Sequence, residues 1–128
     1  MSSTWNQEQL SLFARSDDLY VSPFYSDGKT PGTPTWIWSV VADDALYVRA
    51  YNGQRSRWYR SAVEQQAGKI QIAGQEYDVR FHPVSHDPEL MEHIDQAYRE
   101  KYGDSNYMPP MLQEGPASAT VQILPRET

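Results

Sequence analysis

The sequence predicts a mainly β protein with flanking helices, in the α+β class, on three observations. Two pairs of strand-like runs are each joined by a short turn, at residues 42–44 and at residues 73–74. The clearest helical pattern opens with an acid followed by proline, at Asp87 and Pro88. The 128 residues are 39% hydrophobic and 12% aromatic, which suits one domain, residues 1–128, with a single hydrophobic core.

Composition excludes several classes of function. A formal net charge of −6 argues against a nucleic-acid partner, which would need a broad basic face. The absence of cysteine excludes disulfides, thiolate metal sites and cysteine nucleophiles, and is compatible with a reducing cytoplasm. No apolar run approaches the roughly 20 residues of a membrane span, and the first ten residues do not resemble a signal peptide. We therefore expect a cytoplasmic protein with no nucleic-acid and no membrane partner.

The N-terminal part of the chain is expected to form a helix and then a strand. A helix over residues 6–15 fits the spacing of the apolar side chains, with Thr4 or Asn6 as the N-cap. Residues 19–25 have the composition of a strand. Pro23 removes one backbone donor from this strand, which indicates an edge position or a bend.

A hairpin is expected after a loop over residues 26–34, which concentrates glycine, proline and small polar side chains. Residues 35–41 carry apolar or aromatic side chains on both faces, which predicts an interior strand. After the turn, residues 45–51 form the second strand of the hairpin. Its two faces are expected to be Leu46, Val48 and Ala50, directed inward, and Tyr47, Arg49 and Tyr51, directed outward.

The second half of the chain continues this alternation of strands and helices. Asn52 and Gly53 end the preceding strand, because both residue types tolerate positive φ. A helix is expected over residues 58–67, closing at Gly68. The remaining predicted elements are a hairpin of residues 69–72 and 76–84, a helix over residues 88–102, a loop over residues 104–116 and a strand over residues 118–124.

A cluster of arginines is the main functional signal in the chain. No acidic residue lies between Asp44 and Glu64, yet this window contains Arg49, Arg55, Arg57 and Arg60. Arginine forms bidentate contacts with phosphate and carboxylate, so the window predicts a site for a small anion, aided by backbone amides at the start of the next helix. The alternative is that these arginines are solvated and paired with surface acids.

Residues 35–79 contain a tryptophan-bearing strand, an LYVR strand, an NG loop, an RWYR helix start and the run GKIQIAGQEYDVRF. This region resembles the DUF2255 family of bacterial proteins, and AYREKYG at residues 97–103 and ILPR at residues 123–126 extend the resemblance to nearly the whole chain. The order of elements is similar to that of the deazaflavin-dependent nitroreductases and the pyridoxamine-phosphate-oxidase-like flavoproteins. The resemblance implies a split β-barrel of the FMN-binding type, a homodimer, and FMN or a deazaflavin bound at the dimer interface.

The resemblance also implies which residues would hold the cofactor. In the deazaflavin relatives the phosphate lies against a short glycine-containing loop followed by a Trp-Tyr helix start. The matching positions here are Asn52, Gly53, Arg55, Arg57, Trp58 and Tyr59. Arg49 is expected to join Arg55 and Arg57 at the phosphate, and Trp36 to join Trp58 in the ring pocket. Trp38 is expected to lie in the core, because large aromatic side chains on strands are usually buried.

Two functional hypotheses and one structural hypothesis follow. The first is an oxidoreductase-like protein that binds a flavin or deazaflavin, whose chemistry would belong to the cofactor. The second is a non-enzymatic split-barrel module that binds another small anionic ligand. It is favoured by residues 30–34, TPGTP, where the relatives carry Gly-Arg-x-Ser-Gly. The third is a structural dimer without a ligand.

The remaining candidate side chains favour structural roles. Three histidines share no evident face and are expected to be exposed or capping rather than metal ligands: His82, His86 and His93. Four acids are expected on the solvated face of the long helix: Glu89, Glu92, Asp95 and Glu100. A set of tyrosine and methionine side chains in the C-terminal part of the chain predicts a dimer contact, a lid over a pocket, or ordinary packing on the barrel. Its members are Tyr98, Tyr102, Tyr107, Met108 and Met111.

Overall fold

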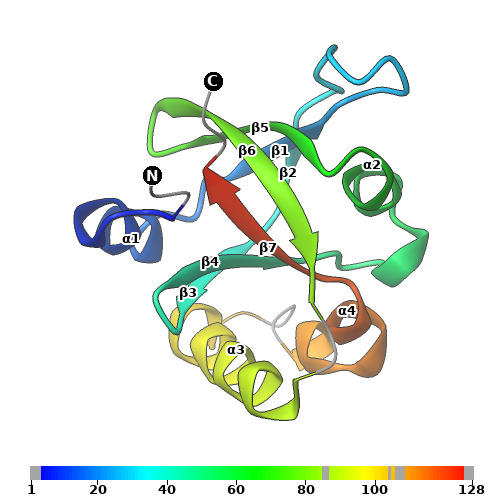
Figure 1. The fold of residues 1–128 in the computed structure, drawn as a ribbon. Coiled ribbons are helices and arrows are strands. Elements are labelled where there is room, and N and C mark those ends of the chain that lie inside the picture. The colour runs from blue at the N-terminus through cyan, green and yellow to red at the C-terminus, as the bar shows by residue number, and fades with distance from the viewer. Residues whose placement is uncertain (1–3, 85–86, 104, 106–108, 126–128) are drawn as a thin grey trace.

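A single antiparallel sheet is the framework of the fold (Figure 1). The computed structural model describes residues 4–84, 87–103, 105 and 109–125. Within these residues seven strands pair in the order β2-β1-β5-β6-β7-β4-β3. The strands are β1 (Tyr20–Pro23), β2 (Thr35–Trp36), β3 (Ser39–Ala42), β4 (Ala45–Arg49), β5 (Ala67–Ile72), β6 (Gln75–Pro83) and β7 (Thr120–Pro125).

Helical segments flank this sheet. Figure 1 shows α3 lying along β3 and β4, while α1 and α2 lie on opposite sides of the molecule. The helical segments of the described chain are α1 (Gln7–Ala14), α2 (Arg57–Gln65), α3 (Pro88–Tyr102) and α4 (Glu114–Ser118), with short 3-10 turns η1 (Gly53–Arg55) and η2 (Pro109–Leu112). The mainly β, α+β fold class predicted from the sequence is confirmed, and the curled sheet has the form of a split barrel.

The curl of the sheet is produced by one short connection. β2 and β3 occupy the two opposite edges of the sheet, yet Ile37 and Trp38 are the sole residues between them. The chain therefore passes from one edge of the sheet to the other within two residues. This is possible only because the two edges curl toward each other. The interior strand predicted over residues 35–41 is wrong for this reason. Its alternation of large side chains also fits two short edge strands that meet at a bend.

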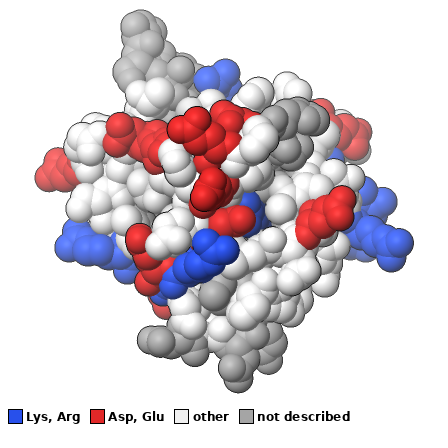
Figure 2. Space-filling view, turned by 90° about the horizontal axis from the view of Figure 1, so that it is seen from below, with Lys and Arg blue, Asp and Glu red and all other residues white. Residues whose placement is uncertain are grey.

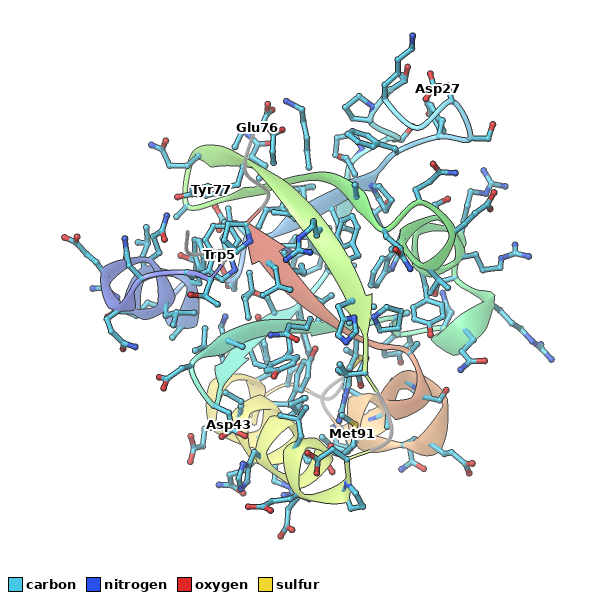
Figure 3. The ribbon with its side chains drawn as sticks, in the orientation of Figure 1. Trp5, Asp27, Asp43, Glu76, Tyr77 and Met91 are labelled. Atoms are coloured by element: carbon cyan, nitrogen blue, oxygen red, sulfur yellow. The ribbon has the colours of Figure 1, made fainter. Side chains whose placement is uncertain are left out.

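An inner core fills the concave side of the sheet. Trp5 packs edge-to-face against Phe13 of α1 and Tyr77 of β6, with ring centroids 5.0 and 5.3 Å apart, as Figure 3 shows for Trp5 and Tyr77. Its indole N–H donates to the carbonyl oxygen of Ile123, at 2.8 Å. These contacts fix α1 against the sheet. The inner core also includes Leu10, Val21, Leu46, Val48, Ile70, Val79, Phe81 and Val121.

An outer core lies between the convex side of β3 and β4 and helix α3. It consists of Val40, Ala45, Tyr47, Ile94, Tyr98, Tyr102 and Met111. The outward-facing side chains of β4 point into this layer, so Tyr47 and Arg49 are buried, with 4% and 0% of their surface exposed. Both faces of β4 are thus covered.

Local turn and capping chemistry agrees with most of the prediction. The hairpin turns have the positive φ angles of mirror-image turns, at Asp43 and Asp44 and again at Ala73 and Gly74. Asn6 caps α1, with its side chain accepting a hydrogen bond from the backbone of Gln9. The carboxylate of Asp87 caps α3 by accepting from the backbone of Glu89 and Leu90. These elements are confirmed.

Three boundaries differ from the prediction. Helix α2 ends at Gln65 because Gln66 adopts the left-handed conformation, with φ 58°, so the helix does not reach Gly68. The predicted loop over residues 104–116 contains η2 and the start of α4, and the last strand begins at Thr120. Glycine is the usual residue at such a helix end, whereas here a glutamine takes the left-handed conformation.

β1 pairs on both sides, with β2 and β5, although Pro23 indicated an edge or a bend. The pairing with β2 involves Tyr20 and Val21 and ends before the proline. The backbone N–H of Phe24 donates to the carbonyl oxygen of Ala67, the first residue of β5, so the nitrogen of Pro23 faces the opposite side, where β2 has ended. The proline therefore costs the sheet no hydrogen bond.

The close approach of β1 and β5 at Gly68 gives a test of the fold. A Cβ atom there would lie 2.5 Å from the carbonyl oxygen of Ser22 and 2.7 Å from Cα of Pro23. We expect Gly68→Ala to lower the free energy of unfolding by about 2–3 kcal/mol, measured by urea denaturation, because the two strands must separate. Gly115→Ala is the control: its Cβ would meet no atom within 4 Å, and alanine in α4 should be neutral or stabilise by up to ~1 kcal/mol. Equal losses in both variants would contradict this packing.

Candidate functional site

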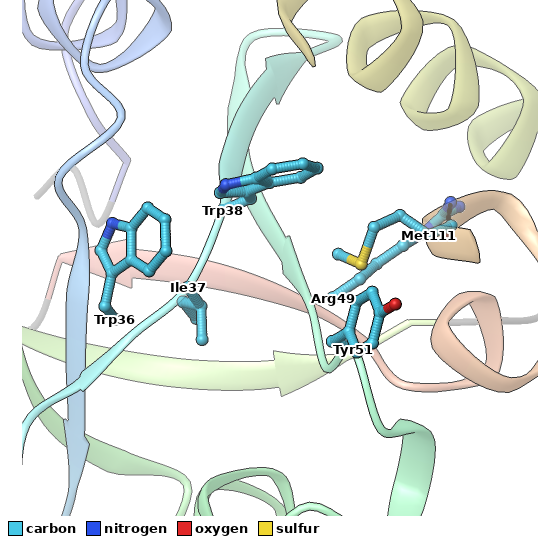
Figure 4. A pocket seen from close by; sticks show the side chains of 6 residues that line it. All are labelled: Trp36, Ile37, Trp38, Arg49, Tyr51 and Met111. Carbon is cyan, nitrogen blue, oxygen red and sulfur yellow. Dashed lines mark hydrogen bonds between the residues drawn. The ribbon is translucent and has the colours of Figure 1, made fainter. Parts of the chain in front are cut away.

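An apolar cavity of about 350 Å³ lies where the two edges of the sheet approach each other. Figure 4 shows Trp36 and Ile37 on one side of it, Tyr51 and Met111 on the other, and the Trp38 ring between them. Trp36 and Tyr51 are 55% and 48% exposed, so they form the mouth of the cavity. The lining is Trp36, Ile37, Trp38, Arg49, Tyr51 and Met111.

The bend between β2 and β3 places three successive residues around this cavity. Trp36 pairs with Tyr20 in the sheet, and its indole N–H donates to the carbonyl oxygen of Asp17 at 2.8 Å. Trp38 stacks on Tyr102, with ring centroids 4.1 Å apart and an interplanar angle of 3°. Trp38 is half-buried and packs against the outer core, as expected, but it also lines the cavity.

Arg49 is the charged residue of the lining, and its guanidinium is held by the protein itself. Nη1 donates to Asp95 at 2.6 Å and to the carbonyl oxygen of Met111 at 3.0 Å. Nε donates to the hydroxyl of Thr120 at 3.0 Å, and Nη2 lies 3.8 Å from the sulfur of Met91. The charge is therefore neutralised inside the fold, and the role predicted for Arg49 at a cofactor phosphate finds no support in this geometry.

Asp95 departs from the predicted pattern of α3 for the same reason. Seen from the side of α3, acidic side chains gather across the middle of the molecule, as Figure 2 shows. Glu89, Glu92 and Glu100 are exposed, as expected of a solvated helix face. The side chain of Asp95 is 26% exposed and forms the ion pair with Arg49, so placing it on the solvated face was wrong.

The other predicted arginines lie on the segment that follows Tyr51. Arg55 closes η1 and Arg57 is the first residue of α2, and both are exposed. Arg57 borders a second cavity of about 320 Å³, together with Trp58. Thr35 also lines this second cavity while its neighbour Trp36 lines the first, so the two cavities lie on either side of β2.

The predicted site residues are thus divided by the fold. Trp36 and Arg49 share the first cavity, and Arg57 and Trp58 share the second.

The remaining predicted residues line neither cavity. Asn52 and Arg55 are exposed on the connecting segment, while Gly53 is buried, with φ 71°. Tyr59 lies in the inner core, where burial raises the pKa of its hydroxyl. A Cβ at Gly53 would lie 3.3 Å from the carbonyl oxygen of Gly115, so this turn packs closely on α4.

The comparisons with known proteins settle the family. Residues 9–123 match the model of DUF2255, described as an uncharacterized protein conserved in bacteria. The chain belongs to this family. The resemblance to DUF2255 seen in the sequence is therefore confirmed, and it covers nearly the whole chain. No protein of curated function matches in sequence.

A solved structure supports the fold of this DUF2255 protein. The crystal structure of the conserved hypothetical protein Rv2991 from Mycobacterium tuberculosis is similar, with a TM-score of 0.65 at 13% sequence identity. The similarity covers 98% of this chain and 83% of the mycobacterial chain. At this identity the likeness concerns the fold alone. In the described part of the DUF2255 chain, no helix has the length and apolar character needed to span a membrane.

Ile37 and Met111 are lining residues of this DUF2255 protein that the sequence reasoning did not place at the site. Met111 belongs to the C-terminal tyrosine and methionine set, for which the sequence predicts a lid, a dimer contact or ordinary packing. It is 2% exposed and packs in the outer core while bordering the cavity. Tyr98 and Tyr102 are buried residues of α3 itself, and Tyr107 and Met108 lie outside the described residues. Packing and cavity lining thus coincide at Met111.

Histidines do not form a metal site within the described residues. No group of three potential metal ligands is found there. His82 is exposed, and His93 is exposed with its Nδ1 2.9 Å from a carboxylate oxygen of Asp43. His86 lies outside the described residues. The expectation of exposed histidines is confirmed for His82 and His93.

The buried ion pair of Arg49 gives a test of stability. Arg49→Met leaves the carboxylate of Asp95 unpaired and removes a donor from Met111 and Thr120. Breaking a fully buried pair costs about 3–5 kcal/mol, and because Asp95 keeps some exposure we expect a loss of about 3 kcal/mol in urea denaturation. Arg55→Met is the matched control on an exposed arginine and should stay within about 0.5 kcal/mol of the parent. A small loss at Arg49 would show that the pair is not needed for folding.

The ion pair of His93 with Asp43 gives a test of pH dependence. Hydrogen bonding to Asp43, together with its charge, raises the pKa of His93, so protonated histidine is favoured in the folded state. The pair should stabilise the protein fully below about pH 6 and lose this effect as pH rises through the folded-state pKa. NMR titration should show that Asp43→Asn lowers the pKa of His93, whereas Asp44→Asn in the same turn has a much smaller effect. Unchanged titration in Asp43→Asn would exclude the pair in solution.

Proposed function

We propose that this protein binds a planar aromatic cofactor of the flavin or deazaflavin type, with its ring in the first cavity. The observation that carries this proposal is the lining, in which Trp36, Trp38 and Tyr51 surround an apolar space of about 350 Å³. This volume is within the range of small-molecule sites, and aromatic faces stack favourably on planar rings. Ile37 and Met111 complete an apolar surface that excludes water from a bound ring.

The phosphate of such a cofactor is assigned to Arg55, since Arg57 borders the second cavity on the other side of β2. The side chain of Arg55 is exposed on the segment that leaves the first cavity at Tyr51. Exposed guanidinium groups can turn toward an anion and hold it in bidentate contacts, and the first turn of α2 adds backbone donors. Arg49 instead shapes the wall of the cavity, because Asp95 already neutralises its charge. The proposal therefore separates ring binding from phosphate binding.

The chemistry in this proposal is the redox chemistry that a flavin or deazaflavin supplies when bound. The residues of this chain would bind and orient the ring and keep water away from it. The proposal includes a homodimer, since the side chains at the mouth, Trp36 and Tyr51, leave about half of their surface for a second copy to cover.

A second candidate function is favoured by the second cavity. Arg57, Trp58 and Ser61 line it, and so do the hydroxyl-bearing residues Thr33 and Thr35. Such a lining suits a small oxyanion without an aromatic ring. This version of the protein would be a non-enzymatic binding module, and the two candidates differ in whether a ring is required.

Binding of ring and phosphate can be tested separately with riboflavin and FMN, which differ by the phosphate group. We expect both to quench tryptophan fluorescence, and an 8-hydroxy-5-deazaflavin to do the same if the site takes deazaflavins. Trp36→Ala should weaken all of them by about tenfold, whereas Trp36→Phe should keep most of the affinity. Arg55→Ala should weaken FMN about tenfold and leave riboflavin unchanged. Arg57→Ala, at the second cavity, should change neither affinity.

Arg60→Ala is the matched control, because Arg60 is exposed on α2 and borders neither cavity. It should change neither affinity. If none of the three ring compounds quenches the tryptophan fluorescence, the proposed binding of a flavin or deazaflavin ring is contradicted. Thermal stabilisation by phosphate or pyrophosphate, lost in Arg57→Ala, would then favour the anion-binding module.

A further inference from the structure

Three residues of α3 lie behind the walls of the first cavity. Asp95, Tyr98 and Tyr102 are spaced at i, i+3 and i+7, which places them on one face of the helix. Tyr98 is fully buried and Tyr102 is 9% exposed, so this face is the one turned toward the sheet. We call these three residues the α3 stripe.

The α3 stripe supports the Trp38 wall at two points. The ring of Tyr102 stacks on Trp38, and its hydroxyl donates to the carbonyl oxygen of Ser39 at 3.1 Å. The hydroxyl of Tyr98 donates to the carbonyl oxygen of Trp38 at 3.4 Å. Burial raises the pKa of Tyr102 to about 12, so its hydroxyl stays a donor at neutral pH.

The opposite wall is supported by the other end of the stripe. Asp95 holds the guanidinium of Arg49, which in turn donates to the backbone of Met111. The guanidinium carbon of Arg49 also lies 5.5 Å from the centre of the Tyr98 ring, a cation–π contact. One helix face thus contacts both Trp38 and the group that fixes Met111.

This support matters because Trp38 belongs to neither edge strand. Ile37 and Trp38 lie between β2 and β3, so no strand pairing sets the orientation of the Trp38 side chain. In Figure 4 the Trp38 ring lies between the helix α3 and the cavity, presenting one face to each. The face toward α3 is the one that stacks on Tyr102.

We propose that the α3 stripe positions both walls of the cavity, with Tyr102 setting the orientation of the Trp38 ring. Tyr102 is therefore a positioning residue: it makes no contact with the ligand and acts through Trp38. The statement about ligand affinity rests on the proposed ring binding, whereas the statement about Trp38 concerns the unliganded protein.

The test compares Tyr102→Leu with Tyr102→Phe, which keeps the ring and loses the hydroxyl. Near-UV circular dichroism in the tryptophan region reports the Trp38 environment without ligand, and riboflavin titration reports the cavity. We expect Tyr102→Leu to alter the tryptophan signal and weaken riboflavin by about tenfold, because an aromatic pair is lost. Tyr102→Phe should keep the signal and stay within about twofold of the parent affinity. Tyr98→Phe, which loses the bond to Trp38, should weaken riboflavin about threefold.

Ile94→Ala is the control for general destabilisation of α3. Ile94 is fully buried in the outer core and is not part of the stripe. Its replacement should lower Tm while leaving the tryptophan signal and the riboflavin affinity unchanged.

The proposal is overturned if folded Tyr102→Leu keeps the parent tryptophan signal, or if Ile94→Ala changes that signal as much as Tyr102→Leu does. Should Tyr102→Leu not fold, an unchanged tryptophan signal in Tyr98→Phe overturns it instead. If the parent protein binds no riboflavin, ring binding fails and the circular dichroism alone decides the positioning role.

Discussion

The two-residue connection between the opposite edges of the sheet is the constraint on which the rest of the structure depends. Ile37 and Trp38 cannot span an open seven-stranded sheet, so the sheet must curl until β2 and β3 come together. The curl produces a concave side that α1 can fill and a convex side that α3 can cover. It also places Trp36 and Trp38 at the meeting point of the edges, where the cavity forms.

Covering the convex side gave β4 two buried faces, and this changes what its arginine does. An outward residue at the end of a barrel strand would ordinarily reach water, but α3 places Asp95, Tyr98 and Met91 around Arg49. A desolvated guanidinium needs its charge and its donors satisfied, and the nearest groups of the fold supply both. Arg49 therefore acts as a connector between α3, β7 and η2 rather than as a free cation.

Local patterns predicted much of this fold, because the two hairpins, the cap of α1 and the start of α3 depend on neighbouring residues. The split strand over residues 35–41 and the burial of Arg49 depend on distant contacts that periodicity does not contain. For the candidate site, the sequence predicted Trp36, which lines the first cavity, and Arg57, which borders the second, but it grouped all the arginines by their proximity along the chain. The fold separates Arg49 from Arg57 because one lies on a strand under α3 and the other begins an exposed helix.

The same connection has a consequence for how the protein behaves among its neighbours. A sheet edge presents unpaired backbone donors and acceptors, onto which a strand of another molecule can add. Here the edge strands are two and four residues long, and they belong to one continuous segment. Because both sheet edges lie on one short segment, little unpaired backbone is left onto which a strand of another molecule could add. This favours solubility in a crowded solution, although the edge strands carry no charged residues.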